Sequence, residues 1–432
     1  MKECIESVIN QTLQEIEIII VDAGSTDGTL ELIESYQKED ARIQIVHSEK
    51  KSYGYQLNKG IALAKGSYIG VVESDDVIDP DMYAVLLDAA EKENLDFAKG
   101  SFINYAITED GQEMIIPDVS IPKNIIGKVI KPSEHKSLLI EDFYLWRGLY
   151  KADFLKENQI IFHESPGAAY QDIGFLYQTF TLAQRVIYLD KCVYKYRRNN
   201  SNSSTYSLKA FSYLAKEYSF ILDELIINKE LYNQWSTYFY YKMLMQCRAR
   251  LRLLAFHDGD INVVKKDIEY LQGLLSKAYE NREIDISVWD MQSQMEFFMF
   301  VRDIFVYEEY YKIQISAQKQ CINNMIKTLK NFSEITLVSD SKILSFIYAL
   351  LNRNKINTIV NICDNDRAKW GNLRMGVKIT SVEKACEDRQ NRAYIISHSG
   401  AKKELKQQLN SFGVEDEQIY IYDLGCDWLF LS

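Results

Sequence analysis

Acidic side chains follow two apolar, β-branched runs of the sequence, at the point where each run ends. Asp22 comes directly after Ile16–Val21, and Glu73 to Asp76 (E-S-D-D) come directly after Tyr68–Val72. Short runs of this kind that alternate with helical patterns predict buried parallel strands covered by helices on both faces. Ligands of such sheets bind beyond the carboxyl ends of the strands, so these acids are candidate site residues.

The adjacent carboxylates of Asp75 and Asp76 repel each other unless a cation lies beside them. A divalent cation with oxygen ligands would remove this repulsion, and Mg²⁺ or Mn²⁺ held by one or two carboxylates commonly holds substrate phosphates as well. Helix capping is the alternative for an acid at a strand end. Asp27, in the turn sequence S-T-D-G-T, suits that role because Asp is a good N-cap residue.

Four segments resemble the nucleotide-sugar glycosyltransferases of family 2. They are residues 18–36 (IIIVDAGSTDGTLELIESY), 58–76 (NKGIALAKGSYIGVVESDD), 166–175 (PGAAYQDIGF) and 194–204 (YKYRRNNSNSS). The resemblance covers about the first 205 residues, with the segments in the family's order. It implies the α/β GT-A fold and transfer of a sugar from a nucleotide-sugar donor.

The same resemblance implies roles for residues of the donor site. Asp22 would accept a hydrogen bond from the nucleotide base, Asp75 would bind the ribose, and Asp76 would hold Mn²⁺ or Mg²⁺. Arg197 would face the diphosphate, and Asn58 would lie in the loop beside the nucleotide. No His within residues 194–204 is placed to bind the metal, so Asp76, the diphosphate and water are the expected ligands.

For the reaction itself, the resemblance makes Asp172 the general base that deprotonates the acceptor hydroxyl. A single displacement of this kind inverts the anomeric carbon. The expected function is therefore an inverting glycosyltransferase that uses a nucleotide-sugar, with a UDP-sugar favoured. The expected acceptor is a glycan or lipid-linked glycan in bacterial surface or capsular glycan synthesis.

The start of the chain departs from the family pattern. Family members begin with a strand of the form V-S-V-I-I-P-x-Y-N, and no such segment precedes the helix predicted from Met1. We expect an N-terminally truncated glycosyltransferase domain, and a degenerate family member is the alternative. A catalytically inactive scaffold or partner subunit is the alternative function. A nucleotidyltransferase is disfavoured because no Gly-rich, Lys- or Arg-bearing phosphate loop opens the chain.

Pattern divides the chain into three predicted regions: a GT-A domain at residues 1–206, a helical region at 207–332 and a Rossmann-like α/β domain at 333–432. Aromatic residues at helical spacing in the second region indicate a bundle core. Lys242 and the arginines at 248, 250 and 252 are interpreted as a solvated face, with an anionic acceptor or a membrane surface as the alternative.

The third region resembles the Rossmann-like module attached to some sugar enzymes. Residues 363–371 (CDNDRAKWG) match its second element, whereas residues 338–342 (VSDSK) carry no glycine where the first element needs it. Glycine lets the backbone approach a pyrophosphate, and Asp340 would repel one. We therefore predict no dinucleotide binding and a structural or protein-contact role. Asp364 is interpreted as a helix cap or as the relic of a ribose-binding acid.

Composition limits the partners. The 432 residues include 61 Asp and Glu against 50 Lys and Arg, a net charge of −11, which disfavours nucleic acid as a ligand. Seven widely spaced Cys without a C-x-x-C pair argue against a disulfide framework and a structural zinc site. No run approaches the roughly 18 apolar residues of a membrane span, and residues 1–12 lack the apolar core of a signal peptide. We expect a protein that is cytoplasmic or peripheral at the inner face of the membrane.

Overall fold

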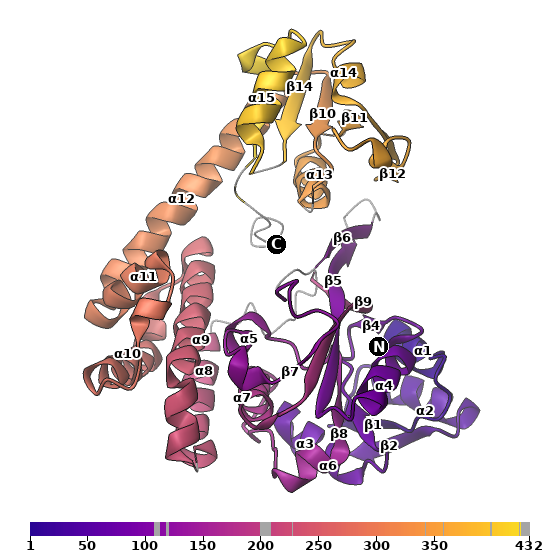
Figure 1. Cartoon of the computed structure of the whole chain (residues 1–432), viewed down its shortest axis with the longest axis vertical. Coiled ribbons are helices and arrows are strands. Elements are labelled where there is room, and N and C mark those ends of the chain that lie inside the picture. The colour runs from indigo at the N-terminus through magenta and orange to yellow at the C-terminus, as the bar shows by residue number, and fades with distance from the viewer. Residues whose placement is uncertain are drawn as a thin grey trace. The chain divides into compact units, whose positions relative to one another are not determined.

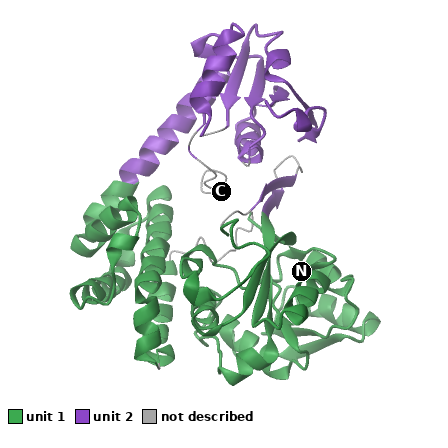
Figure 2. Ribbon diagram, in the orientation of Figure 1, with its two compact units in different colours: residues 1–103, 118–311 green, residues 104–117, 312–432 purple. Residues whose placement is uncertain are grey.

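The chain divides into two compact units (Figure 2). Unit 1 contains residues 1–103 and 118–311, and unit 2 contains residues 104–117 and 312–432. The computed structural model describes residues 1–107, 113–117, 121–198, 209–226, 228–341, 343–356, 358–397, 400–422 and 424. Helices and strands alternate through most of both units, which confirms the predicted mixed α/β class.

The strand predicted at Ile16–Val21 forms a parallel pair in unit 1, whereas the run predicted at Tyr68–Val72 begins with β3 (Tyr68–Gly70) of another sheet, where its pairing is antiparallel and not parallel as predicted. Strand β1 (Ile18–Asp22) pairs with β2 (Ile43–His47), so that Asp22 lies opposite His47 at the carboxyl ends. Helices α1 (Lys2–Ile9), α2 (Thr29–Glu39) and α3 (Tyr53–Leu63) flank these strands in the sequence. Asp22 therefore stands at the edge of the sheet where ligands of parallel strands bind.

A second, seven-stranded sheet runs in the order β3-β8-β5-β9-β4, with β6 on β5 and β7 on β9. The pairs β3–β8, β5–β8, β4–β9 and β7–β9 are antiparallel. Its strands are β3 (Tyr68–Gly70), β4 (Val77–Ile78), β5 (Phe97–Ile107), β6 (Glu113–Pro117), β7 (Val129–Ile130), β8 (Gly148–Lys151) and β9 (Val186–Arg197). The β4–β9 register, with Val77 opposite Lys195, places the acidic motif beside the end of β9.

Helices make up the rest of unit 1 (Figure 1). They are α4 (Met82–Lys92), α5 (Leu138–Glu141), α6 (Ala152–Glu157), α7 (Asp172–Leu182), α8 (Ala210–Phe220), α9 (Lys229–Phe256), α10 (Lys265–Glu280) and α11 (Met291–Arg302), followed by residues 304–311 of α12 (Ile304–Leu329). Helix α7, whose first residue is Asp172, contacts α5, α8 and α9. The helical region thus packs directly against the element that begins with the predicted base.

The predicted aromatic core of the helical region is confirmed for Trp235, Phe239 and Phe300, which are buried, whereas Phe298 is exposed. The predicted solvated face of α9 is wrong for Lys242, which is only 2% exposed. Arg248 also turns inward and forms an ion pair of 3.3 Å with the buried Glu296 of α11. Helical spacing alone could not show which face of α9 packs against α5 and α7.

Unit 2 contains a six-stranded sheet in the order β12-β13-β11-β10-β14-β15, parallel except for β12–β13. Its strands are β10 (Glu334–Val338), β11 (Ile359–Cys363), β12 (Leu373–Arg374), β13 (Val377–Thr380), β14 (Arg392–Ile396) and β15 (Ile419–Ile421). Its further helices are α13 (Leu344–Arg353), α14 (Val382–Ala385) and α15 (Lys402–Ser411). The strand–helix alternation predicted for this region is confirmed.

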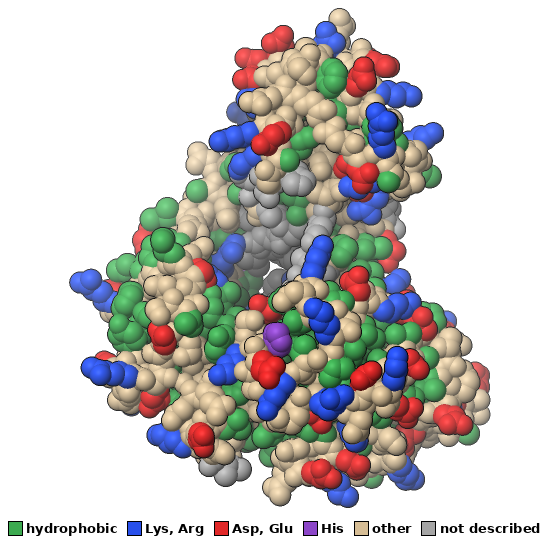
Figure 3. Space-filling view, viewed as in Figure 1, with side chains coloured by type: hydrophobic (Ala, Val, Ile, Leu, Met, Phe, Trp, Pro, Cys, Tyr) green, Lys and Arg blue, Asp and Glu red, His purple; other side chains and the backbone are tan. Residues whose placement is uncertain are grey.

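Charge is mixed over the surface that Figure 3 presents. Lys and Arg side chains alternate with Asp and Glu there, so that face offers no continuous basic surface of the kind that binds a nucleic-acid backbone. Among the described residues, none of the helices combines the length and the apolar character that crossing a membrane requires.

Candidate functional site

Asp76 is fully buried at the start of β4, where both of its carboxylate oxygens accept hydrogen bonds from β9. The backbone N–H of Arg197 donates to Oδ1 at 2.7 Å, and the hydroxyl of Tyr194 donates to Oδ2 at 2.9 Å. Burial, together with the charges of Asp75 and Glu73, raises the pKa of Asp76 to about 8. Asp76 is therefore a crowded carboxylate that gains from a nearby cation.

Arg197 joins the end of β9 to the acidic motif. Its Nε donates to the backbone carbonyl of Asp75 at 3.0 Å, and its guanidinium forms an ion pair with Glu3 of α1. Three predicted donor-site residues, Asp75, Asp76 and Arg197, thus lie in one cluster. Residues 199–204 of the segment predicted to close over the diphosphate lie outside the described residues.

Glu73 links this cluster to Asp172. Burial, with the charges of Asp75 and Asp172, raises the pKa of Glu73 to about 7. The hydroxyl of Tyr53, from α3, donates to its Oε1. From the sequence, Glu73 is among the candidate acids but has no predicted role in the donor site.

Asp172 opens α7 at the end of a tightly fixed loop. The buried side chain of Gln171 accepts a hydrogen bond from the N–H of Ala169 at 2.8 Å and donates to the carbonyl of Gly167 at 3.2 Å. Tyr170 has a left-handed backbone with φ of 71°, which is uncommon for a bulky residue and typical of functional sites. Burial raises the pKa of Asp172 to about 6, within the range that suits a general base near neutral pH.

Asp22 has its carboxylate engaged in the turn that follows β1. It accepts hydrogen bonds from the backbone N–H groups of Gly24 at 2.8 Å and Ser25 at 3.1 Å, and from the Ser25 hydroxyl. Burial opposes ionisation of Asp22, but these hydrogen bonds outweigh it and lower its pKa. In this geometry Asp22 fixes the turn, and its predicted contact with the nucleotide base stays a prediction.

Asn58 also has its side chain engaged. Its amide donates to the backbone carbonyl of Phe162 and accepts from the backbone N–H of the same residue, both at 2.9 Å. This pair of bonds fixes α3 to the chain just ahead of the Asp172 loop. Asn58 thus lies within α3 and not in a loop as predicted, it positions the Asp172 loop, and its predicted contact with the nucleotide stays a prediction.

A divalent cation fits this cluster only together with its substrate. Within the part of the chain that the structure describes, no group of three or more His, Cys, Asp and Glu side chains could hold a metal ion. Asp75 and Asp76 supply the hard carboxylate oxygens that Mg²⁺ and Mn²⁺ prefer, and Mg²⁺ commonly uses one or two such groups plus substrate phosphates. The remaining ligands would come from a diphosphate and water.

The strand ends of unit 2 also carry acids, but those acids are neutralised. Asp364, after β11, accepts hydrogen bonds from the N–H groups of Asp340 at 2.7 Å and Asp366 at 2.8 Å, and pairs with Lys369 at 3.1 Å. Arg374 pairs with the carboxylate of Asp340 at 3.0 Å. The polar groups of the turn after β10 are therefore bonded to one another. This supports the prediction that unit 2 binds no dinucleotide.

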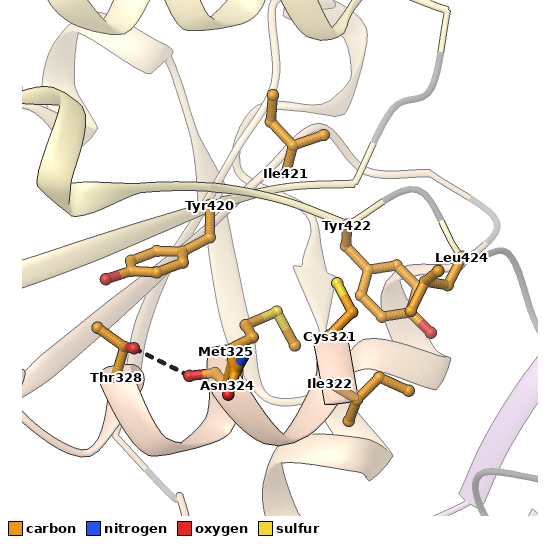
Figure 4. Close-up of a pocket in the computed structure, with 9 residues that line it drawn as sticks. All are labelled: Cys321, Ile322, Asn324, Met325, Thr328, Tyr420, Ile421, Tyr422 and Leu424. Atoms are coloured by element: carbon orange, nitrogen blue, oxygen red, sulfur yellow. Dashed lines mark hydrogen bonds between the residues drawn. The ribbon is translucent and has the colours of Figure 1, made fainter. Parts of the chain in front are cut away.

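Unit 2 also contains an apolar pocket of about 300 Å³ between α12 and the segment from β15 to Leu424 (Figure 4). Met325 and Tyr422 are among the side chains that line it, and its lining residues within the described part of the chain include no Asp, Glu, Lys, Arg or His. A pocket with this lining has no group suited to a phosphate or a metal ion.

Comparison with known proteins identifies the class of the N-terminal part. Residues 1–171 match the model described as Glycosyl transferase family 2. The chain is 33% identical over 225 residues to the uncharacterized glycosyltransferase EpsJ of Bacillus subtilis, a match that covers 50% of this chain and 63% of EpsJ. It is 28% identical over 208 residues to the glycosyltransferase GlyG of Streptococcus pneumoniae, covering 46% of this chain and 67% of GlyG.

A solved structure shows a more distant likeness. S. aureus TarS 1–349, crystallised in complex with UDP-GlcNAc, aligns at a TM-score of 0.47 and 15% identity, covering 74% of this chain and 87% of that one. The likeness to family 2 comes from the sequence matches. The chain spans 63% of the length of EpsJ, and the helical region beyond residue 171 lies outside the family match.

Proposed function

We propose that the chain transfers a sugar from a nucleotide-sugar, with a UDP-sugar favoured, to a hydroxyl group of a glycan or lipid-linked glycan acceptor. The observation that carries this proposal is the acidic cluster. Glu73, Asp75 and Asp76 lie together beside Arg197, and Asp172 is close enough to Glu73 to raise the pKa of that carboxyl. The match to family 2 across residues 1–171 supports the same activity.

In this proposal Asp172 is the general base and the reaction is a single displacement. Its carboxylate takes the proton of the acceptor hydroxyl as that oxygen attacks the anomeric carbon of the donor. The bond from that carbon to the nucleoside diphosphate breaks, and the configuration inverts. Asp76 would hold a Mn²⁺ or Mg²⁺ ion that, when bound, stabilises the negative charge of the leaving diphosphate, and Asp75 would bind the ribose.

Arg197 would contribute a fixed positive charge to the same leaving group. Its guanidinium is already held at the acidic motif by Asp75 and Glu3, so little reorganisation is needed when a diphosphate arrives. Synthesis of a bacterial surface or capsular glycan is the setting that we propose. The proposed location is the cytoplasm or the inner face of the membrane.

A second candidate function is an inactive scaffold or partner subunit. The observation that favours it is that both oxygens of Asp76 are already hydrogen-bonded, to Arg197 and Tyr194. A carboxylate that serves only to join β4 to β9 would show the same contacts.

A screen of nucleotide-sugars separates the two functions. Release of nucleoside diphosphate is measured for a panel of UDP-, GDP- and TDP-sugars with Mn²⁺, with Mg²⁺ and with EDTA. The proposal expects metal-dependent turnover of at least one donor, and loss of turnover in Asp172→Asn. Turnover of no donor by a chain that is folded and binds no nucleoside diphosphate would favour the scaffold.

A further inference from the structure

Helix α9 carries a row of polar side chains, one of which reaches the loop that carries Asp172. Lys242, Gln246 and Arg250 recur every four residues, which places them on one face of the helix. Lys242 and Gln246 are buried. The Arg250 guanidinium lies 5.5 Å from the ring centre of Tyr170, two residues before Asp172.

The ammonium group of Lys242 is buried against the segment from Leu139 to Phe143. Its Nζ donates to the backbone carbonyls of Leu139 at 2.8 Å and Asp142 at 3.2 Å, and it lies 4.5 Å from the ring centre of Phe143. Burial lowers the pKa of Lys242 to about 8, with the charges of Asp142 and Asp172 opposing the shift, so it is a cation at neutral pH. A buried cation is stabilised by nearby acids, and Asp142 and Asp172 are the two acids whose charges act on Lys242.

Glu217 of α8 approaches the same helix end. Its Oε1 accepts a hydrogen bond from the N–H of Gly174 at 3.2 Å, and its Oε2 lies 2.9 Å from Nδ1 of His163. A Cβ atom at position 174 would lie 2.6 Å from Oε1 of Glu217. The glycine at position 174 therefore lets this second carboxylate reach the first turn of α7, two residues from Asp172.

We propose that Lys242 and Glu217, both from the helical region, are positioning residues that set the ionisation of Asp172 for proton transfer. The proposal rests on the function proposed above, in which Asp172 is the general base. It makes α8 and α9 part of the active centre, although both lie outside the segment that matches family 2. The two residues act on Asp172 in opposite directions: Lys242 favours the carboxylate, and Glu217 favours the protonated acid.

Other titratable groups face Asp172 from the elements packed around it. Glu73, after β3, and Tyr53, of α3, each interact with its charge. Tyr218 of α8 and Tyr170 of the loop itself do so as well. Both tyrosines have raised pKa values and stay neutral near pH 7, so the charged groups that decide the balance are Glu73, Glu217 and Lys242.

The test compares Lys242→Gln with Glu217→Gln, both of which keep hydrogen-bonding groups while removing one charge. The carboxyl ¹³C signal of Asp172, identified by its absence in Asp172→Asn, is titrated in each full-length variant. Removing the Lys242 charge should raise the pKa of Asp172, and removing the Glu217 charge should lower it. Each shift should be about 1 pH unit, the size expected for removal of one nearby charge.

The pH dependence of kcat/KM supplies the second readout. Because the base must be deprotonated, activity rises with pH through the pKa of Asp172. The acid limb should therefore move to higher pH in Lys242→Gln and to lower pH in Glu217→Gln. Lys216→Gln, which removes an exposed charge next to Glu217 on α8, is the matched control and should leave both readouts unchanged.

The outcomes separate this inference from the proposed function. Opposite shifts of the Asp172 signal in the two variants support the positioning role. If the acid limb of kcat/KM does not follow those shifts, the positioning role stands and the assignment of Asp172 as the base fails. Shifts in the same direction, or none in either variant that melts near the wild-type temperature, overturn the inference.

Discussion

Both compact units place acids at the carboxyl ends of strands, but the two sets of acids have opposite electrostatics. In unit 2, burial opposes ionisation of Asp364, yet the backbone amides of Asp366 and Asp340 and the charge of Lys369 outweigh it and lower its pKa. In unit 1, burial and neighbouring acids raise the pKa of Glu73 to about 7 and that of Asp76 to about 8. The first set is neutralised within its own unit, and the second is crowded.

The difference shows why a carboxylate at a strand end does not by itself mark a site. Lys369 follows Asp364 by five residues and reaches back to it, so that acid is satisfied locally. Among the described residues, Asp76 accepts its side-chain hydrogen bonds from a backbone N–H and a tyrosine hydroxyl of β9. Buried acids that raise one another's pKa gain from a cation or a cationic ligand, which is the usual condition of functional carboxylates.

The largest expected effect separates the base from a helix cap. Asp172→Asn keeps most capping ability but cannot accept a proton, so sugar transfer should fall by about 10²–10⁴-fold. The affinity for UDP and the melting temperature should stay near wild type. Transfer rates, UDP titration and thermal unfolding check this. Transfer within a few-fold of wild type would show that the base lies elsewhere.

The next effect concerns an acid of unit 1 whose charge is already paired with cations. Asp142 is fully buried, pairs with Lys99 at 2.7 Å and Arg147 at 2.9 Å, and has a pKa held far below its usual range by these two cations despite its burial. Asp142→Ala leaves two buried cations without their partner, and we expect a loss of about 3–5 kcal/mol in the free energy of unfolding.

The control for Asp142 is a surface pair. Glu164 pairs with Lys50 at 2.8 Å and both side chains are exposed, so Glu164→Ala should cost at most about 1 kcal/mol. Denaturant unfolding of both variants measures the difference. An Asp142→Ala variant as stable as Glu164→Ala would mean that the buried cluster does not hold unit 1 together.

The smallest expected effect is none at all. NAD⁺ or NADH at about 1 mM should leave the melting temperature of the whole chain unchanged, because binding to the folded state alone raises it. UDP with Mn²⁺ is the positive control in the same assay. A clear upward shift with either dinucleotide would show that the acids of unit 2 admit a phosphate, and the contrast between the two units would be lost.

Much of the fold could be predicted from the sequence because it depends on local patterns. The apolar run predicted at Ile16–Val21 is the strand Ile18–Asp22, and the run predicted at Tyr68–Val72 begins with the strand Tyr68–Gly70. Both patterns reflect burial of adjacent β-branched residues, which neighbouring sequence alone reveals. The clustering of Asp75 and Asp76 with Arg197 agrees with the resemblance to family 2.

The contacts that the sequence could not reveal join residues far apart in the chain. Lys242 reaches the carbonyls of residues 139 and 142, about a hundred positions earlier, so its burial depends on how α9 docks. Asn58 has a polar side chain within α3, which suits a ligand contact as well as the bonds that it makes with Phe162. The residue type and its spacing would be the same whether Asn58 contacted a ligand or bound Phe162.

The central claim is that the crowded acids of unit 1 form a site for a nucleoside diphosphate together with a divalent cation. The most direct measurement is calorimetric titration of UDP into the protein with Mn²⁺ and with EDTA, for the wild type and for Asp76→Ala. The account predicts binding with Mn²⁺, at least tenfold weaker binding in EDTA, and loss of the Mn²⁺ effect in Asp76→Ala. Equal affinity with Mn²⁺ and with EDTA, or an unchanged Mn²⁺ effect in Asp76→Ala, would contradict it.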